Sequence, residues 1–220
     1  MVFVSIKFFY RKAVGYHKKV LFSVLFLSGA LFGAELYAQK TVLFLGDSLT
    51  AGYGVELREA FPAIIQEKFN KSGRGNIKII NAGISGSTTA SAYGRLRWYL
   101  KIKPDIVFLA LGANDGLRGL NLKEMEGNLE KTIQLAHDNQ IRVILAGMKM
   151  PPNYGKKYTR DFEEVFVKLS KRHKLSFVSF LLKDVAARPE LNIGDGIHPN
   201  PKGHQIIAET ILKTLLPLLD

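Results

Sequence analysis

The chain has 220 residues, of which 47% are hydrophobic and 23% are charged, so it can bury the core of about one domain. It has no cysteine, which excludes a disulfide framework, a thiolate metal site and a cysteine nucleophile. The formal net charge is +12. Residues 1–38 contain five Lys and Arg residues and one acidic residue, Glu35, and so carry +4, which leaves +8 for the rest of the chain. These dispersed charges suit solubility or contact with anionic lipid head groups better than a nucleic-acid interface.

The first 38 residues have the pattern of a targeting segment. Lys18-Lys19 precede an unbroken apolar run, residues 20–34, which is typical of a secretory signal peptide and short for a membrane span. A buried N-terminal helix is disfavoured, because the run shows no helical stripe. We expect residues 1–38 to be a signal peptide cleaved after Ala38, with an uncleaved anchor or a later start as alternatives. The protein would then be exported, to the periplasm, with residues 39–220 as its folded domain.

From Lys40 onward, short apolar runs alternate with helical patterns. Several runs are apolar at consecutive positions, as in strands buried on both faces, and the alternation predicts a parallel sheet with helices on both sides. The predicted strands are 41–45, 77–80, 105–111, 141–146 and 175–180, and the predicted helices are 60–72, 90–100, 122–139, 159–173 and 203–216.

Small and polar residues follow these strands, at the sheet edge where such folds bind ligands. Ser48, in Gly-Asp-Ser-Leu after the first strand, is a candidate nucleophile, although Asp and Ser are also common helix caps. His198 lies in a Gly- and Pro-rich turn three residues after Asp195, so the carboxylate can orient the imidazole and the imidazole can serve as base. Gly86 and Asn114 suit an oxyanion hole, or alternatively turns.

Four stretches together resemble the four blocks of the SGNH, or GDSL-type, hydrolases: GDSLTAGYG, NAGISGSTT, LGANDGLRG and DGIHPN. The stretch MPPNYGKKY is similar to a loop of that family's bacterial periplasmic thioesterase I/lysophospholipase group. The resemblance covers nearly all of the chain after residue 38. Ser87 departs from it, because many relatives in the group carry Asp there.

The resemblance implies an α/β, flavodoxin-like three-layer sandwich with a central parallel sheet of about five strands. It implies that Ser48 attacks an acyl carbonyl, that His198 takes its proton, and that Asp195 orients His198. The N–H groups of Ser48 and Gly86 and the Asn114 side chain would bind the oxyanion. No metal and no organic cofactor are expected. Two further residues would support these loops: Asp47 the serine turn, and Asp115 the loop of Asn114.

The expected activity is hydrolysis of acyl esters and thioesters, with lysophospholipids or short to medium acyl esters as substrates. Ile84, Met150, Pro151 and Tyr154 are candidates for the walls of an acyl groove, although they also suit loop packing. Two alternatives stay open: a carbohydrate O-acetylesterase acting on cell-wall sugars, and a non-catalytic binding protein on the same fold. We expect a monomer that binds a small acyl ester or lipid, with transient contact to a membrane surface and no nucleic-acid partner.

Overall fold

The computed structural model describes residues 39–219, and residues from Gln39 onward form one compact unit. The predicted signal segment and its cleavage site lie outside the described residues. Within the described part, no helix is both long and apolar enough to cross a membrane.

The five predicted strands form one sheet in which every neighbouring pair is parallel, in the order β2-β1-β3-β4-β5. This confirms the predicted flavodoxin-like architecture. The second strand runs three residues further than predicted, because its polar and small last residues still pair with β1. The strands are β1 (Lys40–Gly46), β2 (Ile77–Gly83), β3 (Ile106–Ala110), β4 (Arg142–Ala146) and β5 (Ser176–Val178).

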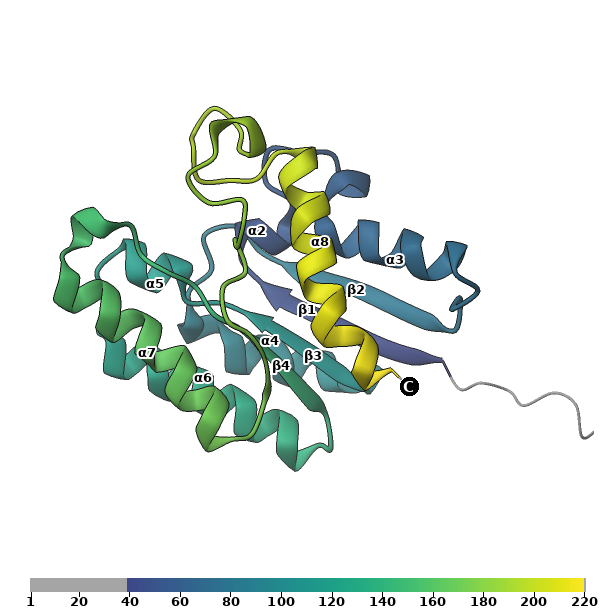
Figure 1. The fold of residues 1–220 in the computed structure, drawn as a ribbon. Helices are drawn as coiled ribbons and strands as arrows, with labels where there is room; N and C mark the ends of the chain where they lie inside the picture. Colours follow the sequence, from purple (N-terminus) through teal and green to yellow (C-terminus); the bar gives the residue numbers. More distant parts are fainter. Residues whose placement is uncertain (1–38, 220) are drawn as a thin grey trace, which may run out of the picture. The chain divides into compact units, whose positions relative to one another are not determined.

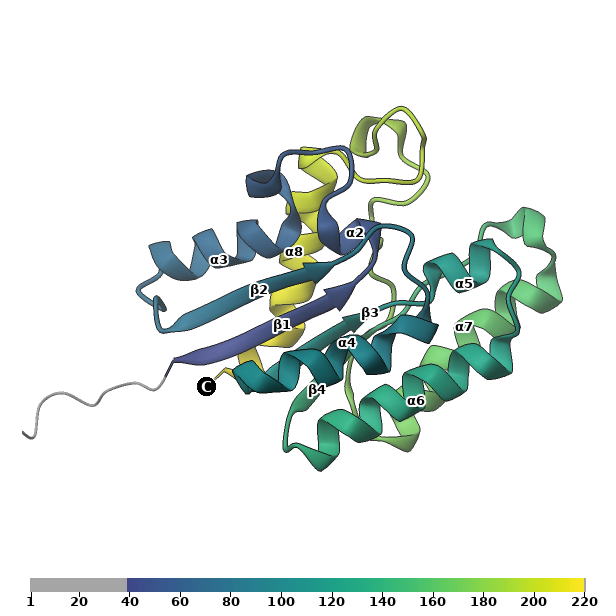
Figure 2. The same cartoon turned by 180° about the vertical axis from the view of Figure 1, so that it is seen from behind.

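Helices cover both faces of the sheet. Helix α8 packs against α3 on one face, and α6 packs against α4 and α7 on the other, as Figures 1 and 2 show from opposite sides. All five predicted helices are present: α3 (Phe61–Lys71), α4 (Ala92–Tyr99), α6 (Leu122–Asp138), α7 (Lys156–Arg172) and α8 (Pro201–Leu215).

Two short helices were not predicted, and both begin right after a strand: α2 (Ser48–Ala51) and α5 (Ala113–Leu117). Each has too few residues to show a helical period. Six single turns of 3-10 helix complete the described secondary structure: η1 (Leu57–Glu59), η2 (Thr89–Ser91), η3 (Leu100–Ile102), η4 (Pro152–Tyr154), η5 (Pro189–Leu191) and η6 (Leu216–Leu218).

An aromatic cluster anchors β1 and β3 to α3. The rings of Phe44 and Phe108, on neighbouring strands, have centroids 4.9 Å apart, and Phe61 at the start of α3 lies 5.8 Å from Phe44. All three side chains are fully buried, and burial of each contributes roughly 1.5–3 kcal/mol. The central strands are therefore a rigid support for the loops at their ends.

The exposed edge of the sheet is closed by a side chain. Gln66 of α3 accepts a hydrogen bond from Ile79 N–H at 2.7 Å and donates one to the Ile77 carbonyl at 3.0 Å. Its amide thus makes the two bonds that a neighbouring strand would make. Because these backbone groups of β2 are already bonded, another strand cannot pair with them at this edge of the sheet.

The strand order places the loops after β1, β2 and β3 side by side. The chain runs from β1 to β2 at one side and then crosses to β3 at the other, so β1 lies at the switch point of the sheet. In open parallel sheets, ligands bind outside the carboxyl ends of the strands at this point. The loops that carry Ser48, Gly86 and Asn114 all start there.

Candidate active site

Ser48 is the first residue of α2, held in a tight turn at the end of β1. Asp47 is the N-cap, and its Oδ1 accepts a hydrogen bond from Leu49 N–H at 3.0 Å. A Cβ on Gly46 would lie 1.9 Å from Oγ1 of Thr50, so only glycine lets α2 fold back against the strand. The local sequence therefore fixes where the serine hydroxyl can be, and Asp47 caps the turn that carries it.

Ser48, His198 and Asp195 form a hydrogen-bonded chain. The Nε2 atom of His198 lies 2.9 Å from Oγ of Ser48, and its Nδ1 atom lies 2.6 Å from Oδ2 of Asp195. The serine and the histidine are 150 positions apart in sequence, so the fold alone brings them together. A hydroxyl, an imidazole and a carboxylate in this order have the geometry of a serine nucleophile with its base and orienting group.

Asp195 is held as a carboxylate. Partial burial opposes ionisation, but the backbone N–H groups of His198 and Ile197 each donate to Oδ1 at 3.0 Å, and the imidazole approaches Oδ2. Together these lower the pKa of Asp195 to about 2. The carboxylate therefore stays charged at any pH near neutrality and holds the proton of His198 on Nδ1.

Two of the predicted oxyanion donors are backbone N–H groups. Among the described residues, the N–H groups of Ser48 and Gly86 have no protein acceptor. Gly86 has a φ of +77°, a left-handed conformation that favours glycine. Asn114, in the first turn of α5, donates one amide hydrogen to the Ser87 carbonyl at 3.1 Å and has a second hydrogen to spare. The three predicted oxyanion-hole groups thus lie on loops that touch one another.

Asp115 ties the loop after β3 to the loop after β2. Its buried carboxylate accepts from the N–H of Thr89 at 2.9 Å and from the Thr89 hydroxyl at 2.6 Å. From the same segment, Arg118 donates to the Gly86 carbonyl at 3.0 Å. These bonds join the loop that carries Gly86 to the segment that carries Asn114.

The carboxyl group of Asp47 is almost completely buried, with 1% of the residue exposed. Burial raises its pKa to about 6, against the opposing effects of the Leu49 N–H and of the nearby charges of His198 and Arg95. Its Oδ2 atom has no hydrogen-bond partner among the described residues. Perturbed pKa values are common at functional sites, and this carboxyl group directly precedes Ser48.

Three residues at the site were missed by sequence reasoning: Tyr53, Arg95 and Arg118. The ring of Tyr53 lies 4.7 Å from the imidazole of His198, and Arg95 donates to the carbonyls at the ends of β1 and β2. Tyr53 and Arg118 fall within motif blocks, but a tyrosine or arginine in a loop carries no pattern of its own. In the sequence, Arg95 cannot be distinguished from an exposed arginine of a helix. Its contacts with the strand ends become apparent only in the folded structure.

The four predicted groove residues do not share one environment. Ile84, Pro151 and Tyr154 are exposed, whereas Met150 is 8% exposed and belongs to the hydrophobic core. A Cβ on Gly116 would lie 2.5 Å from the Met150 sulfur, so this side chain fills space beneath α5. Met150 as a groove wall is therefore corrected, because core packing uses its side chain.

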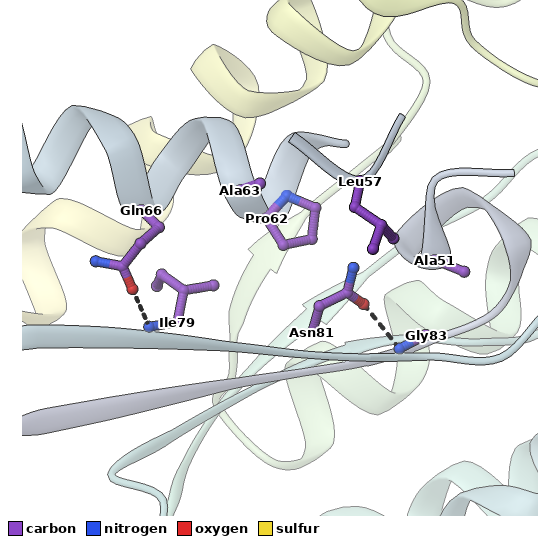
Figure 3. Close-up of a pocket in the computed structure, with 8 residues that line it drawn as sticks. All are labelled: Ala51, Leu57, Pro62, Ala63, Gln66, Ile79, Asn81 and Gly83. Atoms are coloured by element: carbon purple, nitrogen blue, oxygen red, sulfur yellow. Dashed lines mark hydrogen bonds between the residues drawn. The ribbon is translucent and has the colours of Figure 1, made fainter. Parts of the chain in front are cut away.

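A cavity of about 540 Å³ adjoins the nucleophile helix, between α3 and β2. Figure 3 shows the Gln66 and Asn81 amides along its strand side, each bonded to β2 backbone, Gln66 to Ile79 and Asn81 to Gly83. None of the predicted catalytic or groove residues lines it. Its lining residues are Ala51, Leu57, Pro62, Ala63, Gln66, Ile79, Asn81 and Gly83.

Residues 39–219 contain no group of three or more His, Asp or Glu side chains that could hold a metal ion.

Comparison with known proteins gives one family and several relatives. Residues 44–206 match the model of the GDSL-like Lipase/Acylhydrolase family. The chain is 36% identical over 184 residues to an arylesterase of Vibrio mimicus, covering 83% of this chain and 92% of the relative. It is 34% identical over 196 residues to thioesterase 1/protease 1/lysophospholipase L1 of Escherichia coli K12, covering 89% and 92%. The crystal structure of TesA superposes with a TM-score of 0.78 at 34% identity, covering 81% of this chain and 99% of that one.

Proposed function

Because the chain belongs to the GDSL-like lipase/acylhydrolase family and is a hydrolase of ester bonds, we propose that it works through an acyl-enzyme formed on Ser48. The observation that carries the proposal is the hydrogen-bonded chain from Ser48 through His198 to Asp195, at 2.9 and 2.6 Å. A non-catalytic binding protein would have no need of it, and the named relatives are enzymes.

In the first half-reaction, Oγ of Ser48 attacks the acyl carbonyl while Nε2 of His198 takes the hydroxyl proton. The negative charge that develops on the carbonyl oxygen is stabilised by the N–H groups of Ser48 and Gly86 and the amide of Asn114. As the tetrahedral intermediate collapses, its bond to the leaving oxygen or sulfur breaks, and His198 returns the proton to the departing alcohol or thiol.

In the second half-reaction, a water molecule attacks the acyl-serine carbonyl and gives a proton to His198. Collapse of this intermediate releases the carboxylic acid, and Ser48 recovers its proton. Asp195 remains ionised throughout, because the same hydrogen bonds that lower its pKa persist, and it stabilises the imidazolium formed in both steps.

For substrates, we propose acyl esters and thioesters of short to medium chain length, including lysophospholipids. Relatives named arylesterase and thioesterase 1/lysophospholipase L1 support this range. Exposed apolar side chains on the loops and short helices that follow the strands can contact an acyl chain or a lipid surface. They are Tyr53, Ile84, Leu117, Leu120, Tyr154 and Ile197.

We also propose that the protein is exported to the periplasm, acts as a monomer and touches membrane surfaces transiently. Support for export comes from the basic and apolar pattern of the first 38 residues, and support for surface contact from those apolar side chains together with the positive net charge. Export is tested by fractionating expressing cells and sequencing the N-terminus of the product. Light scattering tests the monomeric state, and sedimentation with anionic vesicles tests the membrane contact.

The decisive experiment follows the acyl group. The protein is mixed with p-nitrophenyl esters from acetyl to palmitoyl and with acyl thioesters, and the trapped intermediate is located by peptide mass after acid quench. We expect the acyl mass on the peptide that contains Ser48, and loss of both turnover and label in Ser48→Ala. The matched control is Ser85→Ala, an exposed serine of the adjoining loop. Full activity in Ser48→Ala would remove the proposal, and turnover of acetyl esters alone would favour a sugar acetate as substrate.

A further inference from the structure

Arg95 lies beneath the site, at the point where two strands end. It sits half-buried on α4, and its Nη2 atom donates to the Gly46 carbonyl at 2.9 Å and also to the Ala82 carbonyl. Gly46 ends β1, and Ala82 is the second-to-last residue of β2. One nitrogen atom therefore joins the ends of two neighbouring strands.

Those two strand ends lead directly to the reacting groups. Gly46 is two residues before Ser48, and Ala82 is four residues before Gly86. The Gly46 carbonyl also accepts the N–H of Ile84 at 3.1 Å, so it links the nucleophile turn both to Arg95 and to the loop after β2. Since the nucleophile and the oxyanion donors must keep a fixed separation, this junction controls a distance on which the reaction depends.

Burying a charged guanidinium group here costs free energy, and hydrogen bonds to two strand ends do not by themselves require a charge. In the described part of the chain, the Nε and Nη1 atoms of Arg95 are buried without a hydrogen-bond partner. Burial lowers the pKa of its guanidinium, opposed by Tyr99 and Asp47. A neutral amide could donate to the same carbonyls without burying a charge. The positive charge itself therefore needs a reason.

The positive charge of Arg95 favours the ionised form of the buried carboxyl group of Asp47. The charged groups that face it are His198, from the loop before α8, and Arg95, from α4, while α2 contributes only the neutral N–H of Leu49. Its Oδ2 atom makes no hydrogen bond to any described residue, so the ionised form is stabilised by the Leu49 N–H on Oδ1 and by the charges of His198 and Arg95. An ionised Asp47 next to Ser48 in turn favours the imidazolium that His198 becomes during the reaction.

We propose that Arg95 is a positioning residue for ester hydrolysis: it locks the Ser48 turn against the Gly86 loop, and its charge favours the carboxylate form of Asp47 beside Ser48. This inference rests on the proposed acyl-enzyme function of Ser48. Arg95 touches neither substrate nor reacting atoms, and it acts through the two strand ends and through Asp47.

The test compares Arg95→Met, Arg95→Lys and the matched control Arg97→Met, an exposed arginine on the same helix. The values of kcat and KM for p-nitrophenyl butyrate are measured from pH 5.5 to 9, after unfolding curves show that each variant is folded. For Arg95→Met we expect kcat at pH 7 to fall on the order of 100-fold, with KM within about threefold, from displacement of the nucleophile and loss of the charge.

The pH profile separates the electrostatic role from a merely structural one. In Arg95→Met the acid limb of kcat should move to higher pH, because Asp47 then stays protonated longer, so the loss is smaller at pH 9 than at pH 7. Arg95→Lys should restore the position of the limb but not the full rate, since an ammonium cannot copy the planar guanidinium. Adding Asp47→Asn to Arg95→Met should abolish the shift.

Two results would overturn the proposal: an Arg95→Met enzyme with unchanged kcat, or one whose loss is equal at every pH. If Arg95→Met does not fold, Arg95→Lys against Arg97→Met decides, because an unaltered rate in Arg95→Lys contradicts the positioning role. Failure of the acyl-enzyme proposal is seen separately, in a Ser48→Ala enzyme that still turns over.

Discussion

The ring of Tyr53 packs against the imidazole of His198, with centroids 4.7 Å apart and planes inclined by 46°. Tyr53 is half-exposed, so the contact with the histidine lies at the surface of the protein. An aromatic face next to an imidazole stabilises the imidazolium by about 0.5–1 kcal/mol at an exposed site. The pair therefore affects the step in which His198 becomes charged.

We predict that Tyr53→Ala lowers kcat about two- to fivefold and that Tyr53→Phe is nearly unaffected, because the ring and not the hydroxyl makes the contact. Steady-state kinetics at pH 8 with p-nitrophenyl butyrate measures the effect. Tyr93→Ala, an exposed tyrosine on α4, is the control. Equal losses in the Ala and Phe variants would show that the hydroxyl matters instead.

Asn114→Ala should reduce kcat by about 10²–10³ with little change in KM, the usual effect of removing one oxyanion donor. The amide also donates to the Ser87 carbonyl, so the variant needs an unfolding curve to show that the loop is intact. Asn139→Ala, an exposed asparagine after α6, serves as control. If KM rose and kcat stayed constant, Asn114 would bind the substrate and the transition state equally, which contradicts a role in the oxyanion hole.

Asp195→Asn should lower kcat by about 10²–10⁴, because the amide can no longer hold the His198 proton on Nδ1 or stabilise the imidazolium. Since the pKa of Asp195 is lowered to about 2, protonation of this group should contribute nothing to the pH profile of the parent above pH 4. Rate profiles from pH 4.5 to 9 check both statements. A small loss, within tenfold, would contradict the orienting role.

The sheet and the candidate catalytic residues could be predicted from sequence because their signals are strong and local. Consecutive apolar residues, as in 106–111, are typical of strands buried on both faces, and three of the four motif blocks begin at or near the end of a strand. The last strand is shorter than predicted, Ser176–Val178, because the chain bends where Leu181 N–H bonds to the Gly147 carbonyl. Such a tertiary bond leaves no trace in the local pattern.

Side-chain environment is much harder to predict than side-chain identity. Met150 and Tyr154 lie four residues apart in one motif, yet one packs in the core under Gly116 and the other is exposed. Arg95 could not be predicted as a site residue, because its partners are backbone carbonyls at the ends of two strands. Every residue has a backbone carbonyl, so such a contact leaves no pattern in the sequence. Contacts to backbone and degrees of burial appear only when the elements are packed together.

Asp47→Asn should stabilise the protein more at high pH than at low pH. Because burial raises the pKa of Asp47 from 3.8 to about 6, the folded state binds this proton more tightly than the unfolded state. Its ionisation therefore reduces stability as pH rises from about 4 to 6, by about 3 kcal/mol in total. The asparagine cannot ionise, and its Oδ1 can still accept from Leu49 N–H.

Urea unfolding of parent and Asp47→Asn at pH 4 and pH 8 measures this difference. We expect the stability of the variant relative to the parent to increase by about 2–3 kcal/mol between the two pH values. At the same time kcat should fall, since the charge next to Ser48 is lost. A pH-independent difference in stability would show that Asp47 has an ordinary pKa in the folded state.

His204 affects stability in the opposite direction to Asp47: its protonation at low pH destabilises the folded state. The residue is completely buried at the start of α8, where its Nδ1 accepts a hydrogen bond from the N–H of Phe61 at 3.3 Å. This bond caps the first turn of α3, whose N-cap residue, Ala60, has no side chain that can do so. Protonation of Nδ1 would break the cap, and among the described residues Nε2 has no partner to compensate.

Burial lowers the pKa of His204 from 6.5 to about 4, with nearby Glu59 opposing the shift and His198 adding to it. The neutral form is thus favoured in the folded state, whereas the unfolded state takes up a proton below pH 6.5. Stability is therefore unaffected above that pH and is lost as pH falls from 6.5 toward 4, by up to about 3 kcal/mol. We expect His204→Gln, which can still accept from Phe61 but cannot titrate, to remove most of this loss. Urea midpoints at pH 7, 5.5 and 4.5 test it, with the exposed His137→Gln as control; equal acid sensitivity in parent and His204→Gln would assign the loss to other groups.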